Sequence, residues 1–540
     1  MTSAAQPTAA ATPAPWVAPA TPAHPAARHP GLVLAVVLLA AFAINLDTTI
    51  VNVALPALSN QLHASTTDLQ WVVDGYNLAF AALVLAGGTI GDRYGRRGTL
   101  AGGLALFAAG ALLAALAGGP GELIAIRVVM GAAAALIFPT TLSVISQTFP
   151  DRAARAKAIG AWGAVTGAGV AVGPVAGGAL LERFSWVSVF LALVPVAVLA
   201  LAGTLLVVPA GRAPAANGLD GRGLAASVVA LATLVYTVIQ APEHGWGSAR
   251  TVAGFAVAAA AFTALVLIER RQAAPMLDVR LFTNLRFTAA SGAVTVAFFA
   301  LFGFIFLITQ YMQVLRGYGP LSTGVRILPV AASIAVTSAT GTLLAVRIGN
   351  KAVVGTGLAL LVVAFTWISF ATATMSYGQI ALQMVVLGSG LGLTTAPATE
   401  SIMGVVRPEQ AGVGSAVNDA TRELGGTLGV AVIGSVYASL YRRSLDAGGL
   451  PGPVRAAARS SYAAARSIAG QLPAQAAQLL TRQADAGFLS GLHAGCRVGA
   501  GVCAAGMLAV LAFLPARPQP APAGRGQQAP PRRRHGATGR

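Results

Sequence analysis

Long apolar runs, separated by short polar segments, follow one another along most of the chain. Each run is roughly 20 residues long, the length that an α-helix needs to cross the hydrocarbon core of a bilayer. Backbone groups inside a bilayer must be hydrogen-bonded within the segment, so each run is predicted to be a spanning helix. Fourteen such spans are predicted, over 31–55, 70–91, 98–118, 122–147, 157–181, 187–209, 223–241, 251–268, 287–311, 324–346, 352–372, 379–402, 411–439 and 489–514.

Basic residues in the connecting segments predict the orientation of these spans. If the N-terminus is cytoplasmic, the short inner loops carry fifteen Lys and Arg residues, whereas the short outer loops carry only Arg183, Arg250 and Arg316. Positively charged loops stay on the cytoplasmic side, so we expect both termini there. The outer segment 440–488 is also rich in arginine, and its stretch 461–483 is predicted to be weakly helical at the membrane surface.

The composition agrees with an all-α membrane protein. Charged residues make up 10% of the chain, against roughly a quarter in soluble proteins. The net charge of +18 would suggest a nucleic-acid partner in a soluble protein, but the loop arginines account for it here, so none is expected. The Pro-rich ends, 1–30 and 515–540, are predicted to be disordered cytoplasmic tails. No Walker loop, nucleophile elbow or metal-binding motif occurs in the sequence, so we expect neither an enzyme nor a cofactor.

A short internal echo suggests how the spans are grouped. Arg93-Tyr94-Gly95-Arg96-Arg97 follows the second span, and Arg347-Ile348-Gly349-Asn350-Lys351 follows the tenth. A repeat at this distance predicts two related six-helix bundles, 31–209 and 287–514, with two extra spans inserted within 210–286.

The connection after the second span carries a dense motif. Its glycines allow a tight turn, and its carboxylate could hold a neighbouring helix end or guanidinium in one state and release it in another. The alternative is a signal for orientation alone. The residues assigned to gating are Gly88, Asp92, Arg93, Gly95, Arg96 and Arg97.

A second group of glycines surrounds a proline in the fifth span. Small residues let helices pack backbone to backbone, and proline removes a helical hydrogen bond. Gly173, Pro174, Gly177 and Gly178 are therefore predicted to form a bending helix that moves during function. Ordinary small-residue packing is the alternative.

Acidic residues inside apolar spans indicate function, because burying their charge is costly. Asp47, Asp74 and Arg127 lie at similar depths in the first, second and fourth spans, and we infer a cluster of the three. A carboxylate balanced between burial and a guanidinium can load a proton on one side and release it on the other. A static Asp47–Arg127 pair is the alternative.

The thirteenth span holds a second acidic group. Asp419 and Glu423 are four residues apart and share a helix face, beside Arg422. We assign these three to proton coupling as well. An Asp419–Arg422 pair that satisfies only itself is equally compatible with the sequence.

Several motifs resemble those of one family. Leu46-Asp47-Thr48-Thr49-Ile50-Val51-Asn52-Val53-Ala54-Leu55-Pro56, the Gly88–Arg97 connection, the fifth-span Gly/Pro motif and the segment 412–429 resemble the 14-span drug:proton antiporters of the major facilitator superfamily. Glu423 departs from that pattern, in which Gln is common. The resemblance implies a monomer in the plasma membrane that is driven by the proton gradient and exports hydrophobic, often cationic drugs. Export of an endogenous metabolite or natural product is the nearest alternative, followed by a membrane sensor on the same scaffold.

Polar residues of the spans are the candidates for the substrate cavity. They are Asn45, Asn52, Tyr76, Gln310, Asn418 and Glu400. Glu400 lies near the cytoplasmic end of its span, where contact with headgroup water is the simpler interpretation.

Overall fold

The computed structural model describes residues 29–210, 220–272, 275, 277–405, 411–446 and 452–515. Nearly all of the two predicted tails, 1–30 and 515–540, lies outside these residues. Throughout the described part of the chain the secondary structure is helical, without a strand. Fourteen helices are long and apolar enough to span a membrane, which confirms the predicted fold class.

The helices divide into three groups along the chain. The first comprises α1 (Pro30–Gln61), α2 (Thr66–Tyr94), α3 (Arg96–Ala114), α4 (Pro120–Thr148), α5 (Arg152–Arg183), α6 (Val187–Leu191) and α7 (Leu193–Val207). The second comprises α8 (Gly221–His244) and α9 (Ala249–Arg271). The third comprises η1 (Val279–Thr283), α10 (Leu285–Gln310), η2 (Tyr311–Leu315), α11 (Pro320–Ile348), α12 (Asn350–Ile368), α13 (Tyr377–Met403), α14 (Ala411–Asp446), α15 (Gly452–Ala458), α16 (Tyr462–Ala469) and α17 (Ala474–Phe513). We call α1–α7 the N-half and α10–α17 the C-half.

Local sequence explains where many of these helices begin. Before α2, the Ser65 hydroxyl accepts a hydrogen bond from the Asp68 amide at 3.1 Å, and the Asp68 carboxylate accepts one from the Ser65 amide at 2.9 Å. Such reciprocal caps satisfy backbone groups that the first helical turn leaves free. Ser376 and Gln379 form the same kind of cap at the start of α13.

The internal echo of the sequence has a structural counterpart. Gly95 joins α2 to α3 with φ = 107°, and Gly349 joins α11 to α12 with φ = 92°. Residues with a side chain rarely adopt these positive angles, so both turns require glycine. The helix pairs also correspond, because α2 packs closely on α4 in the N-half as α11 packs on α13 in the C-half.

The two extra spans lie between the halves in the sequence, and in space one of them contacts both halves. α8 packs against both α2 and α14, which belong to different halves, and α9 packs mainly against α8. Only 11% of the most apolar window of α9 is buried, so most of its surface is left to face lipid.

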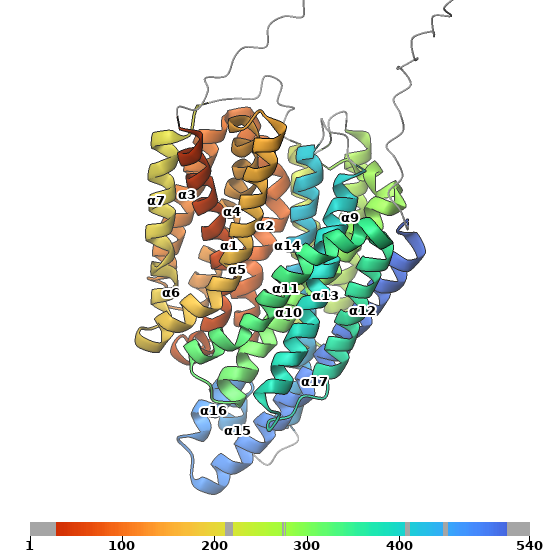
Figure 1. Cartoon of the computed structure of the whole chain (residues 1–540). Helices are drawn as coiled ribbons and strands as arrows, with labels where there is room; N and C mark the ends of the chain where they lie inside the picture. The colour runs from red at the N-terminus through yellow and green to blue at the C-terminus, as the bar shows by residue number, and fades with distance from the viewer. Residues whose placement is uncertain are drawn as a thin grey trace, which may run out of the picture.

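Helices occupy much of the predicted outer segment 440–488. α14 continues to Asp446 and α17 already begins at Ala474, well before the apolar run at 489. Between them, α15 and α16 form a small unit that projects from one end of the bundle, and we call these two helices the cap (Figure 1). The stretch 461–483, predicted to be weakly helical, contains α16 and the start of α17, whereas the extension of α14 beyond 439 and the helix α15 were not predicted.

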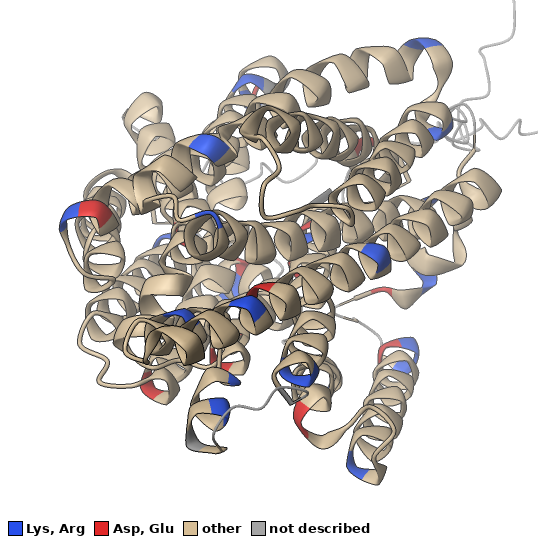
Figure 2. Cartoon of the chain, turned by 90° about the horizontal axis from the view of Figure 1, so that it is seen from below, with Lys and Arg blue, Asp and Glu red and all other residues tan. Residues whose placement is uncertain are grey.

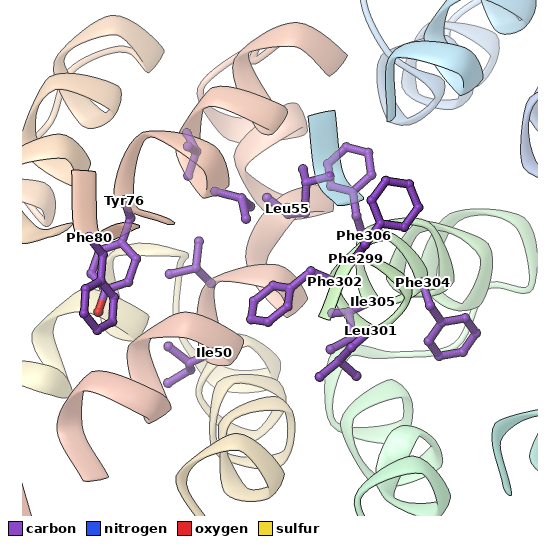
Figure 3. Packing of buried hydrophobic residues seen from close by; sticks show 14 of the residues in the cluster. Ile50, Leu55, Tyr76, Phe80, Phe299, Leu301, Phe302, Phe304, Ile305 and Phe306 are labelled. Carbon is purple, nitrogen blue, oxygen red and sulfur yellow. The ribbon is translucent and has the colours of Figure 1, made fainter. Parts of the chain in front are cut away.

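Charges are sparse along the spans and gather near the helix ends, as a view from the cap shows (Figure 2). Buried apolar side chains fill the interior, and the phenylalanines of α10, among them Phe299, Phe302, Phe304 and Phe306, point to several sides of that helix (Figure 3). Against this background the few buried charges are conspicuous, since each one must be compensated within the protein.

Candidate functional site

The N-half contains a fully buried ion pair. Arg127 of α4 donates to both carboxylate oxygens of Asp47 of α1, at 2.8 and 2.7 Å. Its Nε donates to the Val72 carbonyl of α2 at 3.0 Å, so one guanidinium joins three helices. The exposed fraction is 0% for Asp47 and 1% for Arg127. The sequence prediction that these two residues meet agrees with this geometry.

Tyr76 of α2 completes this group. The Arg127 guanidinium carbon lies 4.3 Å from the centre of the Tyr76 ring, a distance at which a cation is attracted to the ring face. The side chain is fully buried, and its hydroxyl has no hydrogen-bond partner among the described residues.

Asp74 does not join this pair. It is fully buried, yet neither of its carboxylate oxygens is hydrogen-bonded within the described part of the chain. Val72 and Tyr76 are four residues apart and face Arg127, whereas Asp74 lies midway between them, about 200° around the helix. The inferred cluster of three residues is therefore formed only in part. Asp47 and Arg127 meet, but Asp74 lies on another face of α2.

The C-half acids form a looser group on α14. Asp419 is 4% exposed, and its carboxylate lies 3.8 Å from the Arg422 guanidinium, close enough for a weak ion pair. The same guanidinium covers the ring of Phe298 of α10 at 4.6 Å. One oxygen of Asp419 and one of Glu423 are buried without a hydrogen-bond partner among described residues. A carboxylate with an open acceptor can take up a proton or a cationic group.

The residues proposed for the substrate cavity differ in their surroundings. Asn45, Asn52 and Gln310 are buried and donate to carbonyls of their own helices, at 2.9, 2.9 and 3.2 Å. Asn418 accepts a hydrogen bond from Thr399 of α13 at 3.0 Å, which links two helices of the C-half. Glu400 is exposed, as the simpler interpretation of its position expected.

The connection after α2 forms a compact polar junction in the N-half. Asp92 and Arg96 form an ion pair at 3.0 Å, and Arg96 also donates to Gln147 of α4 at 3.1 Å. Arg97 donates to the Leu205 carbonyl of α7. Arg93 lies over the exposed ring of Tyr94 at 5.7 Å. The junction thus ties α2, α3, α4 and α7 together at the end of the bundle opposite the cap.

The glycines of α5 permit two close helix contacts. A Cβ on Gly173 would lie 2.0 Å from the Thr49 hydroxyl of α1, and one on Gly177 would lie 2.8 Å from Ile50. On the other side of α5, a Cβ on Gly178 would lie 2.5 Å from the Pro320 carbonyl of α11. Pro174 is in turn so close to Gly324 that a Cβ there would lie 2.1 Å from the Pro174 carbonyl. Gly88, by contrast, has ordinary space beside Pro139.

The halves meet mainly at the end that carries the cap, which we call the cap end. Gln70 of α2 donates to the carbonyls of Val430 and Ala431 of α14, at 3.3 and 3.2 Å. Among the described residues, every hydrogen bond between the two halves lies toward this end. The other partners are Ser59 with Ser461, the Thr66 amide with Ser460, Val53 with Gln313 and Thr67 with Arg442.

Sequence reasoning missed Gln70 and the cap serines. Gln70 precedes Asp74 by one helical turn. A second polar residue at this spacing, within an apolar span, was the signal that could have indicated a polar contact with another helix. Nothing in the local sequence of Ser460 and Ser461 indicates a contact with residues some 400 positions earlier.

Comparison with known proteins identifies the family. Residues 37–430 match the model of the Major Facilitator Superfamily. The multidrug efflux pump LfrA of Mycolicibacterium smegmatis is 35% identical over 85% of this chain and 91% of its own length. The tetracenomycin C resistance and export protein of Streptomyces glaucescens is 32% identical over 87% of this chain and 89% of its own length.

Solved structures agree on the fold. A bacterial homologue of the lysosomal transporter Spinster, in an inward-facing and unoccupied conformation, has a TM-score of 0.66 at 19% identity, covering 92% of this chain and 99% of that one. The nucleoside transporter NupG gives a TM-score of 0.60 at 11% identity, covering 90% and 100%. The protein is thus a multi-pass membrane transporter, not an enzyme. The chain belongs to the Major Facilitator Superfamily, where its relatives include multidrug efflux pumps and antibiotic-resistance proteins.

Proposed function

We propose that this transporter exports hydrophobic, often cationic drugs or antibiotics in exchange for protons. The observation that carries the proposal is the buried Asp47–Arg127 pair, whose guanidinium lies over the ring of Tyr76. A charge within a span is costly and is retained where it serves transport. Asp47, Asp74, Asp419 and Glu423 are the proposed proton-coupling acids, with Arg127 and Arg422 as their counter-charges.

Competition between a proton and a cation explains the exchange. Asp74 and Glu423 have carboxylate oxygens without a hydrogen-bond partner in the described residues, so each can be neutralised by a proton or by a positively charged substrate. A proton and a cationic substrate that bind to the same carboxylate exclude each other, so binding of either one favours release of the other. The stacked rings of Phe298 and Phe302 on α10 offer an apolar surface for the rest of a drug molecule.

We also propose that the two halves move by alternating access. With both termini in the cytoplasm, the cap end faces outward, and the contacts of Gln70, Ser59 and Gly178 close this outer side. Opening it requires α2 to separate from α14 and α5 from α11. The Gly88–Arg97 junction and the glycines of α5 are the proposed gating elements. In this proposal the protein functions as a monomer in the plasma membrane, and it uses the proton gradient and no cofactor.

A second candidate function is export of a natural product that the cell itself makes. The relative named for tetracenomycin C resistance and export favours this possibility, because its name joins resistance with export of one compound. Both functions use the same site and differ in the breadth of substrates.

The test measures proton movement in inverted membrane vesicles that contain a pH-sensitive dye. Addition of a substrate drug should release protons from vesicles with the natural protein, and Asp47→Asn or Asp419→Asn should reduce this response at least tenfold at equal expression. Asp278→Asn is the matched control, since Asp278 caps a short helix outside the spans and Asn can also cap it.

Two results would contradict the proposal. A proton response that persists unchanged in both acid variants would rule out their assigned role. If no drug of a broad panel causes proton movement but one natural product does, the protein exports that natural product and not a range of drugs.

A further inference from the structure

A cluster of two arginines and two tyrosines lies at the cap end of the C-half and has no part in the proposed mechanism. Arg326 of α11 lies between the rings of Tyr318 and Tyr377, with its guanidinium carbon 4.3 and 5.3 Å from their centres. Arg316 lies 5.7 Å from the centre of the Tyr318 ring and donates to the Tyr318 hydroxyl at 3.4 Å. Tyr318 therefore stands between two guanidinium groups.

The positive charge of this cluster is not compensated by the protein. No acidic side chain of the described residues lies within 4 Å of either Arg316 or Arg326. Glu182 of α5 is near Gly319, where an added Cβ would lie 3.6 Å from its carboxylate, but it forms no ion pair with either arginine. Two adjacent cations repel each other, so an anion would stabilise the arrangement.

Arg326 also has an unused donor. Its guanidinium donates to the Ser322 hydroxyl and, at 3.2 Å, to the Ser322 carbonyl, while its Nε is buried without a partner among the described residues. Arg316 donates to the Met375 carbonyl. The tyrosine rings and backbone carbonyls thus hold both guanidinium groups in place. The Nε of Arg326 remains available to donate a hydrogen bond. Such preorganised guanidinium groups suit bidentate recognition of phosphate.

The cluster lies near the cap end of the span that α11 forms. Arg326 is six residues after the start of α11, which corresponds to about 9 Å along the helix. Its neighbours Val325 and Leu328 are exposed, as expected of residues in contact with lipid chains. The N-terminus of α11 lies at the same end, but the Glu182 carboxylate is near its N-cap Gly319, so the attraction for an anion comes from the two arginines.

We propose that Arg316 and Arg326, with Tyr318 and Tyr377, form a binding site for a singly charged phosphate group at the membrane surface. The phosphate belongs either to an anionic lipid headgroup or to a free anion. Because Arg326 lies on α11 and Tyr377 is the first residue of α13, an occupant of the site stabilises the contact between these two helices at the cap end. The aromatic rings shield the guanidinium groups from bulk water and keep them within reach of lipid headgroups.

The experiment measures lipid binding to the purified full-length protein by native mass spectrometry. We expect phosphatidylglycerol to bind at least tenfold more tightly than phosphatidylcholine. The double variant Arg316→Gln/Arg326→Gln should lose this preference. The control Arg250→Gln/Arg443→Gln removes two exposed charges from the same end of the molecule and should retain it.

Two further measurements separate the sources and guard against misfolding. If inorganic phosphate at millimolar concentration displaces phosphatidylglycerol from the natural protein, the site accepts a free anion, whereas binding of lipid alone identifies the headgroup. Arg326→Lys keeps the charge but loses the planar fork, and it should weaken phosphatidylglycerol binding severalfold in a folded protein. Equal binding of both lipids to the natural protein, or equal lipid binding by the two double variants, would overturn the proposal.

Discussion

At the residue scale, the buried Asp47–Arg127 pair is the contact on which we expect stability to depend most. Removing two charges from water costs several kcal/mol per ion, and the two short bonds from one guanidinium nitrogen to the carboxylate, with the extra bond to the Val72 carbonyl, offset this cost. The pair therefore tolerates simultaneous replacement far better than the loss of one partner, which leaves a buried charge unpaired.

A double-mutant cycle tests this asymmetry. Arg127→Met should destabilise the protein by about 3–5 kcal/mol, because Asp47 would keep a buried charge without a partner. Asp47→Asn combined with Arg127→Met should regain most of that stability but none of the proton-coupled transport. The measurement is thermal unfolding in detergent, together with the vesicle assay. Equal destabilisation by the single and double changes would contradict a paired, buried charge.

Residue depth could be predicted from sequence, but residue direction could not. Counting residues from the start of a span placed Asp47 and Arg127 at one level, and they do meet. The same count placed Asp74 with them, although a two-residue offset from Val72 turns it to another face of α2. The rotation of a helix about its axis depends on packing with neighbours, such as the contact of Gln70 with α14, and hydropathy does not contain that information.

At the scale of elements, α5 illustrates how glycine positions select the partners of a helix. Gly173 and Gly177 allow α1 to approach one side, while Gly178 allows α11 to approach another. Gly163 lies in the same helix with open space around it. The glycines are therefore not equivalent, and only those at contacts are expected to be sensitive to an added methyl group.

Gly178→Ala should favour the state that is open at the cap end. Its new methyl group would meet the backbone of Pro320 and Leu321 at 2.5 and 2.7 Å, so α5 and α11 would have to separate. Labelling of a cysteine placed near this interface by a membrane-impermeant maleimide should rise severalfold. Gly163→Ala is the control and should leave labelling unchanged, since nothing lies within 4 Å of its Cβ. Identical labelling of the two variants would show that this contact does not control opening.

The number of spans was predictable because each apolar run must cover the same membrane thickness. The ends of the helices were less predictable, since α14 and α17 continue beyond the apolar runs into surroundings where polar residues are favourable. Of the cap, α15 was not predicted, whereas α16 lies within the stretch 461–483 that was predicted to be weakly helical. Its α16 is held by tertiary contacts, such as the bond from the Tyr441 hydroxyl to the Ser461 carbonyl at 3.2 Å, rather than by a hydropathy signal.

At the scale of the whole molecule, the cap joins two halves that must separate if transport proceeds by alternating access. It belongs to the C-half, but Ser461 contacts Ser59 of α1 through their hydroxyls at 2.5 Å, and the Ser460 carbonyl accepts from the Thr66 amide at 2.7 Å. These bonds lie far from the Asp47–Arg127 pair along the axis of the bundle. Any coupling between the two regions must therefore pass through rigid movement of the halves.

A reversible crosslink can test that requirement directly. The paired hydroxyls place the β-carbons of Ser59 and Ser461 within about 5 Å, near the separation that a disulfide needs. In a background with Cys496→Ala and Cys503→Ala, oxidation of Ser59→Cys/Ser461→Cys should reduce drug transport at least tenfold, and a reductant should restore it. Drug binding from the opposite end should persist, because the crosslink closes only the cap end. Ser59→Cys alone serves as the control for oxidation. Full transport by the crosslinked protein would mean that the cap moves with the N-half, and that the halves separate elsewhere.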